Sequence, residues 1–284
     1  MNLWSLLHRG SRRMRSVVVT ALLPAFAACS GAWNDPYPAS ERGDSVLYSA
    51  FSQRPKHLDP AKAYASDEYD FISQVYEPPL QYHYLKRPYT LIPATAAGMP
   101  KPQFFDARDR RLPDKADAKS VAYSVYELRI REGIRYAPHP AFAQDASGKA
   151  VYLSMTRDEL RGKTRLLDFK QTGTRELTAR DYIYQIKRLA HPRVHSPILG
   201  HMSEYIIGLK AYSERLAAED KKLGAGRKPG GAAPFLELNQ DEISGVTEVD
   251  RYTWRVRVKG KYPQFGYWLA MPFFAPVPVE ADRF

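Results

Sequence analysis

Two histidines four residues apart are the first candidates for chemistry in this chain. His191 and His195 could both project from one helical face toward a metal ion. However, Pro192 lies between them and interrupts a helix, and no acidic partner follows in a metalloprotease pattern. A histidine at the end of a helix also suits the negative pole of the helix dipole. We therefore expect His191 to lie at a helix terminus, and we expect no metal site.

A glycine-rich run, Gly224–Gly231, could cradle a phosphate group through its backbone amides. Pro229 occupies the position at which the dinucleotide fingerprint needs glycine, and no Gly-Lys-Ser/Thr sequence occurs. We therefore interpret residues 224–234 as a flexible linker.

Nucleophilic and acid–base chemistry find little support in the sequence. No Gly-x-Ser-x-Gly nucleophile elbow is present. Two carboxylate pairs, Asp67-Glu68 and Asp241-Glu242, are adjacent in sequence, so their side chains point in different directions and are expected to be solvated or to cap helices. The sequence therefore predicts a protein that is not an enzyme and that needs no cofactor.

The single cysteine, Cys29, follows a segment typical of exported proteins. Residues 1–28 contain four arginines and no acidic residue, then the apolar run Val17–Ala28, which is shorter than the roughly 20 residues of a spanning helix. We predict a signal peptide over residues 1–28. The small residues before Cys29 are similar to a bacterial lipobox, which predicts an acylated thiol there. Cleavage nearby without acylation stays an alternative, because Phe26 replaces the usual leucine.

The net charge does not require a nucleic-acid partner. The chain has 42 basic and 31 acidic side chains, a balance of +11 that falls to +7 without the four arginines of the leader. Acidic and basic residues are interleaved, as in Arg157–Arg161, and no basic block with stacking aromatics stands alone. We therefore expect no nucleic acid among the partners.

Helical periodicity predicts three helices that would position other side chains. The first begins at Ser66–Glu68, which offers a cap and an acidic first turn, and it ends before Pro78. The second begins at Thr178, with Asp181 completing a capping box, and should bury one face up to Ala190. The third spans about 203–223, with a shared apolar face made of Tyr205, Ile206, Leu209, Tyr212 and Leu216.

Alternating residues predict strands at Val46–Ala50, Tyr123–Ile130, Ile243–Val246 and Tyr252–Val258. In the last, Tyr252, Trp254, Val256 and Val258 should point inward. The highly charged stretch 100–120 is expected to be an exposed loop, and residues 276–284 show no sign of a terminal helix.

Several of these segments together resemble the extracellular solute-binding proteins of family 5, the oligopeptide and dipeptide receptors of ABC importers. The matching pieces are a strand at Val46–Ser49, the turn Leu58-Asp59-Pro60, the segment Tyr76–Leu80, and the stretch Glu176–Ala190, which is similar to the family sequence LTAEDFVYSLKRLADP. The resemblance extends over nearly all of residues 46–281 and is weak around 144–174.

The resemblance implies an α/β fold of the type II periplasmic binding proteins. Residues 29–44 would be a tether, and residues 45–284 would form the first lobe with its inserted subdomain, with the second lobe missing. The implied function is periplasmic capture of peptides or similar solutes for an inner-membrane ABC permease, with membrane attachment through Cys29. Alternatives are a lipid-anchored interaction or signalling protein of the envelope, without a role in transport, and an inactive truncated product.

In such a receptor, the loops after the first strand and the first helix would face the ligand cleft. The resemblance therefore nominates Ser52, Gln53, Tyr76 and Glu77 as ligand-binding residues. A place in the hydrophobic core is the alternative for Tyr76.

Overall fold

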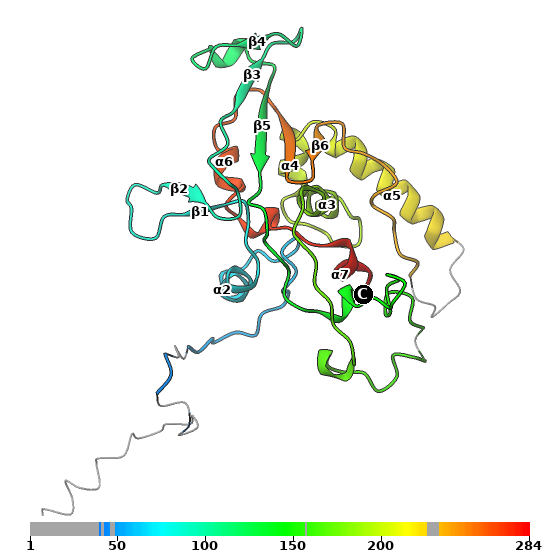
Figure 1. The fold of residues 1–284 in the computed structure, drawn as a ribbon. Coiled ribbons are helices and arrows are strands. Elements are labelled where there is room, and N and C mark those ends of the chain that lie inside the picture. The colour runs from blue at the N-terminus through cyan, green and yellow to red at the C-terminus, as the bar shows by residue number, and fades with distance from the viewer. Residues whose placement is uncertain (1–39, 41–42, 46–48, 157, 226–232) are drawn as a thin grey trace, which may run out of the picture. The chain divides into compact units, whose positions relative to one another are not determined.

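The computed structural model describes residues 40, 43–45, 49–156, 158–225 and 233–284. The chain divides into two compact units, residues 1–52 and 53–284, and the second unit contains the helices and strands discussed below. Its main sheet has the order β4-β3-β5-β7-β6, with every neighbouring pair antiparallel (Figure 1). A two-stranded hairpin, β1–β2, and several helices accompany this sheet. The predicted mixture of helices and sheet is confirmed.

The centre of the sheet is the long pair of strands β5 (Tyr123–Arg129) and β7 (Thr253–Lys259). Alternate residues of both strands face the core, so Leu128 lies opposite Trp254 in the register and both are buried. Edge strand β6 (Val246–Asp250) follows on the far side of β7. The strands predicted at 123–130 and 252–258 are confirmed, whereas the one predicted at 243–246 begins only at Val246.

The charged stretch 100–120 is not the simple exposed loop that its composition predicts. It contains β3 (Gln103–Phe105), β4 (Arg111–Leu112) and the short 3-10 helix η2 (Ala118–Ser120). Strand β3 pairs with β5 and buries Phe104, while Asp106, Arg108, Asp109 and Arg110 occupy the turn between β3 and β4. The prediction was wrong because the charges of the turn obscured a very short strand.

Helix α3 (Ala179–Leu189) lies at the centre of the second unit. Its capping box is confirmed, because the backbone amide of Thr178 donates to a carboxylate oxygen of Asp181 at 2.9 Å. The expectation of a single buried face was wrong: every α3 residue except Arg180 is buried. The physical reason is that α3 contacts β6, β7 and the 3-10 helix η5 (Pro272–Phe274), so the chain surrounds it.

Helix α2 (Ser66–Val75) begins one residue earlier than a Ser66 cap would require, since Ala65 occupies the N-cap position. Glu68 supplies the capping interaction instead. Its carboxylate accepts the backbone amides of His57 and Tyr64 at 2.9 Å and of Ala65 at 3.1 Å. The side chain is 3 % exposed, so of the two expectations for Glu68, solvation or helix capping, the structure shows capping.

These three bonds make the stability of the chain sensitive to acid. Burial by itself would raise the pKa of Glu68, but the three amide donors outweigh it and hold the pKa below the ordinary 4.5. A depressed pKa contributes stability above the unfolded value and loses it as pH falls through the folded value. We expect Glu68→Gln to lower the unfolding free energy by about 1–3 kcal/mol near neutral pH.

The difference in unfolding free energy between Glu68→Gln and the wild-type chain should shrink in thermal unfolding experiments performed well below pH 4.5. Asp67→Asn, which changes the adjacent carboxylate in the same turn, is the matched control and should have little effect at either pH. If Glu68→Gln lowers the unfolding free energy by the same amount at every pH in this range, the ionised Glu68 carboxylate is not the source of the stability.

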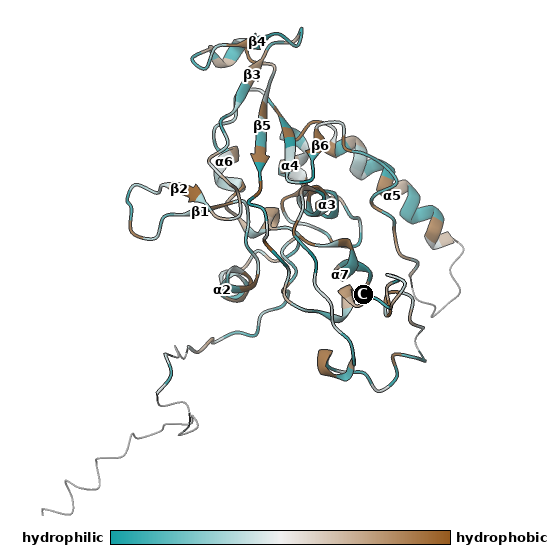
Figure 2. Ribbon diagram, viewed as in Figure 1, coloured by the Kyte–Doolittle hydropathy of each residue, from teal (hydrophilic) through white to brown (hydrophobic). Residues whose placement is uncertain are grey.

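The helix predicted over 203–223 is two helices, α4 (Leu199–Tyr205) and α5 (Leu209–Ala225). They are separated at Gly208, whose φ of +83° is in the left-handed region, and a Cβ there would lie 2.3 Å from the Ser244 hydroxyl. The predicted apolar face of α5 is confirmed by the buried Leu209, Tyr212 and Leu216. Hydrophilic and hydrophobic patches alternate along α5 in Figure 2.

The remaining elements are β1 (Leu80–Tyr82), β2 (Leu91–Pro93), α6 (Phe265–Trp268), α7 (Val279–Arg283), η3 (Pro140–Phe142) and η4 (Leu166–Asp168). The expectation that residues 276–284 hold no helix was wrong, since α7 forms there.

The predicted leader and Cys29 lie outside the described residues, and so does most of the predicted linker at 224–234. Of the strand predicted at 46–50, only residues 49 and 50 are described, and they are not in a strand. Within the described part of the chain, no helix has the length and apolar character to span a bilayer.

Candidate functional site

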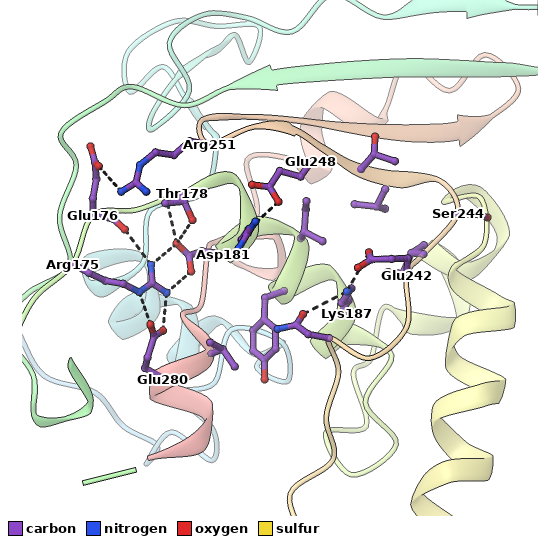
Figure 3. Close-up of a pocket in the computed structure, with 18 residues that line it drawn as sticks. Arg175, Glu176, Thr178, Asp181, Lys187, Glu242, Ser244, Glu248, Arg251 and Glu280 are labelled. Atoms are coloured by element: carbon purple, nitrogen blue, oxygen red, sulfur yellow. Dashed lines mark hydrogen bonds and ion pairs between the residues drawn. The ribbon is translucent and has the colours of Figure 1, made fainter. Parts of the chain in front are cut away.

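An open cavity of about 980 Å³ lies over one side of α3. Its walls come from the segment around α3, from the stretch 239–251 that includes β6, and from α7 (Figure 3). Most of its lining side chains are polar or charged, including Arg175, Asp181, Lys187, Glu248 and Glu280. A concave site of this size with converging polar groups is the best-formed candidate for ligand binding among the described residues.

Arg175 forms the fixed end of the cavity. Its guanidinium bonds both carboxylate oxygens of Asp181, at 2.6 and 2.9 Å, and both oxygens of Glu280, each at 2.7 Å. Burial would lower the pKa of Arg175, but the two carboxylates raise it well above its usual value. Arg175 is therefore a permanent cation whose charge is neutralised by α3 and α7 together.

The second arginine at this end, Arg251, is held at the surface by Glu176. Arg251 and the hydroxyl of Tyr252 both donate to Glu176 Oε2 at 2.9 Å, and the amide of Gly133 donates to Oε1 at 2.7 Å. The bond from Arg251 is the main reason that the pKa of Glu176 is lowered. This carboxylate joins the loop before α3 to the turn between β6 and β7.

Two further ion pairs lie along the open side of the cavity (Figure 3). Arg180 Nε lies 2.8 Å from Glu248 Oε2, and Lys187 Nζ lies 3.3 Å from Glu242 Oε2. Lys187 is buried at 2 % exposure, but Arg180 and Glu242 are 79 % and 74 % exposed. Because exposed pairs contribute little stability, Arg180 can exchange Glu248 for a ligand group at small cost. Glu242 is the partner of the buried Lys187, but its own exposed carboxylate is accessible to a second cation.

Strand β6 supplies a backbone edge to the same cavity. It is one of the two edge strands of the sheet among the described residues, opposite β4, and Val246, Thr247 and Glu248 line the cavity. An edge strand offers N–H and C=O groups that can pair with an extended peptide. The cavity therefore combines a backbone edge with exchangeable charges of both signs, which suits reversible binding.

A second charge network, which includes Tyr184, attaches α7 to α3. Arg188 donates to both carboxylate oxygens of Asp59, at 2.9 and 2.8 Å, and to Asp282 at 3.1 Å. Burial opposes ionisation of Asp59, yet the bonds from Arg188 leave its pKa below the ordinary value. The Tyr184 hydroxyl also donates to Asp282, at 2.7 Å. Asp59 of the Leu58-Asp59-Pro60 turn therefore has a structural role.

The four nominated ligand-binding residues do not line this cavity. Ser52 belongs to the first compact unit and Gln53 to the second, and both side chains are exposed. Glu77 is exposed just after α2, and Tyr76 is partly buried, with a pKa raised by burial and by the charge of Asp59. Their role in ligand binding stays a prediction.

The histidine pair does not form a site. Helix α3 ends at Leu189, and the ring nitrogen Nδ1 of His191 accepts the backbone amide of Arg193 at 3.0 Å. His195 is exposed, with a φ of +56°, so the two imidazoles do not share a helical face. Across the described ranges, no group of three or more His, Cys, Asp or Glu residues could hold a metal ion.

Sequence reasoning did not identify the residues that make the cavity. Arg175 lies 105 positions before Glu280, and no local pattern relates the two. Thr178 and Asp181 were recognised as a capping box and Glu242 as half of a carboxylate pair, but neither pattern indicated a cavity or the bonds from Asp181 to Arg175.

Comparisons with known proteins found neither a matching family model nor a matching curated protein. Among solved structures, the chain is similar to the Escherichia coli murein tripeptide binding protein MppA, with 18 % identity and a TM-score of 0.44 over 79 % of this chain and 29 % of that one. It is also similar to Listeria monocytogenes OppA bound to peptide, with 17 % identity, a TM-score of 0.41 and coverage of 78 % and 28 %.

A third similar structure is the ABC transporter-associated periplasmic binding protein DppA from Helicobacter pylori in complex with the peptide STSA. It is 15 % identical, with a TM-score of 0.41 and coverage of 79 % of this chain and 29 % of that chain. The chain thus spans less than a third of the length of these proteins.

Proposed function

We propose that this chain binds peptides or similar solutes as part of the substrate-binding component of an ABC importer, with the fold of a type II periplasmic binding protein. The observation that carries the proposal is the open cavity of about 980 Å³ beside edge strand β6. The motifs that resemble family 5 solute-binding proteins support the same assignment. Delivery to a permease, a periplasmic location and a lipid anchor at Cys29 belong to the proposal and rest on the sequence.

In the proposed complex, an extended peptide lies along β6 and pairs with its backbone. Its carboxylate replaces Glu248 as the partner of Arg180, and its ammonium group binds the exposed carboxylate of Glu242. Arg175 stays bonded to Asp181 and Glu280, so the wall of the cavity keeps its shape while the open side adapts. Backbone pairing is independent of side chains, which favours a broad range of peptides.

The proposal predicts that binding depends on the charged ends of the peptide. In titration calorimetry with a mixture of short peptides, Arg180→Gln should weaken binding on the order of tenfold, since a hydrogen bond to a charged group contributes about 1.5–3 kcal/mol. Peptides with acetylated and amidated ends should bind the unaltered chain with a similar loss.

The matched control is Arg161→Gln. Arg161 is also an exposed arginine in an ion pair, here with Asp158, and it does not line the cavity. It should leave the affinity unchanged. The proposed site would be ruled out if Arg180→Gln bound peptides as tightly as the unaltered chain does, and if capped peptides bound as tightly as free ones. If no peptide produces heat at any concentration, the proposed function itself fails.

A further inference from the structure

The loop His83–Thr90, between β1 and β2, exposes large apolar side chains at its tip. Tyr84 is 88 % exposed, Leu85 78 % and Tyr89 63 %, and the loop projects beyond the neighbouring strands (Figure 1). Single exposed apolar residues are ordinary on a protein surface, but a cluster on one projecting loop marks an interaction surface.

The charge of this loop has one sign. Lys86 and Arg87 follow the apolar pair directly, and the sequence contains no acidic residue between Glu77 and Asp106. The Arg87 guanidinium lies 4.6 Å from the centre of the Tyr89 ring, so cationic and aromatic groups share the tip. Such a surface is complementary to a partner with dense negative charge.

Part of the backbone of the loop is hydrogen-bonded within the loop itself. The ring nitrogen Nδ1 of His83 accepts the amides of Leu85 and Lys86 at 3.2 and 3.3 Å, and Arg87 donates to the carbonyls of Tyr84 and Lys86 at 3.3 and 3.0 Å. The amide of His83 bonds the Thr90 carbonyl at 2.8 Å. A loop with internally bonded backbone groups can enter a less polar medium at reduced cost.

The base of the loop is held in place by aromatic packing. Tyr82 stacks on Tyr267 of α6 with ring centres 6.1 Å apart, and it meets the edge of Tyr89 at 5.8 Å. The tip is therefore presented from an ordered hairpin, so little conformational entropy is lost when it binds.

We propose that the loop His83–Thr90 docks on the surface of an anionic lipid bilayer. Tyr84, Leu85 and Tyr89 enter the headgroup region, where tyrosine and leucine side chains partition favourably. Lys86 and Arg87 extend toward lipid phosphates, with their aliphatic stems against the apolar boundary. The proposal is independent of peptide binding and of any anchor at Cys29, because it rests on the hairpin alone.

A fluorophore at the tip tests this contact locally. The chain has one cysteine, so Cys29→Ser with Leu85→Cys provides a single labelling site for an environment-sensitive dye. On vesicles of phosphatidylcholine mixed with phosphatidylglycerol, the label at position 85 should shift to the blue and become shielded from aqueous quenchers. The same dye at Lys222→Cys, on the exposed side of α5, should not respond.

The contribution of charge is tested by the double variant Lys86→Gln/Arg87→Gln, labelled at the same position. Each cation near an anionic surface contributes about a fivefold gain in partitioning, so the double variant should bind roughly thirtyfold more weakly. Lys221→Gln/Lys222→Gln removes the same net charge from α5 and should bind as the parent does.

The proposal is overturned if the label at position 85 stays in water on anionic vesicles, or if it inserts equally into vesicles of phosphatidylcholine alone. It is also overturned if both double variants weaken binding equally, since that would reflect net charge and not the loop. Shielding of the label only by an added protein, and never by lipid, would assign the tip to a protein partner.

Discussion

Replacing Arg188 with methionine should lower the free energy of unfolding by up to about 3–5 kcal/mol, because it removes a buried cation from two partly buried carboxylates. Arg188 is 7 % exposed and bonds Asp59 and Asp282 simultaneously, so its loss affects three separate parts of the chain. The Asp59 turn, α3 and α7 would all lose a shared contact. Urea denaturation followed by far-ultraviolet circular dichroism would measure the change.

The matched control for Arg188→Met is Arg161→Met. The side chain of Arg161 is 84 % exposed, and its pair with Asp158 is equally exposed, so its replacement should change the unfolding free energy by at most about 0.5 kcal/mol. Adding Asp59→Asn to Arg188→Met should recover part of the loss, because it removes one of the unpaired charges. Equal stability of Arg188→Met and the control would refute the role of the network.

Replacing Trp254 with alanine should cost about 3–5 kcal/mol, since the indole is 1 % exposed and fills the space between the sheet and α3. Its ring stacks on Tyr182 of α3, with centres 5.7 Å apart and planes 12° from parallel. The variant leaves a cavity at this contact. Thermal unfolding of the two proteins, at one protein concentration, measures the difference.

Trp254→Phe separates packing from hydrogen bonding at the same position. The indole nitrogen has no hydrogen-bond partner within the described part of the chain, so its removal leaves no new unpaired group. We expect a loss of only about 1–2 kcal/mol, from reduced volume. A loss as large as that of Trp254→Ala would indicate that the nitrogen makes an essential bond.

The elements that repeat locally were predictable from the sequence. The alternation from Tyr123 onward identifies β5, and the sequence from Thr178 to Ala190 identifies α3 with its cap. These predictions succeeded because the signal for a strand or a capped helix lies within about a dozen neighbouring residues. Where a local signal was weak or masked, as in the strand around Phe104 or the break at Gly208, prediction failed.

The candidate site was hardly predictable at all. Its first wall, near Arg175, depends on a pair with Glu280 formed across 105 positions, and the neighbouring Arg188 bonds Asp59 across 129. Asp59 stood out as part of a recognisable turn, but its bond to Arg188 could not be read from that turn. Likewise, Lys187 is an ordinary helical lysine in the sequence, and only the fold shows that it is a buried cation with Asn239 and Glu242 as its partners.

Residues close together in the chain were enough to predict β5, β7 and the capped helix α3, the charge of the hairpin loop and the family that the motifs resemble. Contacts between distant segments explain why α3 is buried on nearly every side, why α7 is held by two arginines, and why a cavity opens beside β6. The physical reason is that charge pairs and cavities form between segments brought together by folding, and hydrophobic burial selects those segments without any constraint on their separation in sequence.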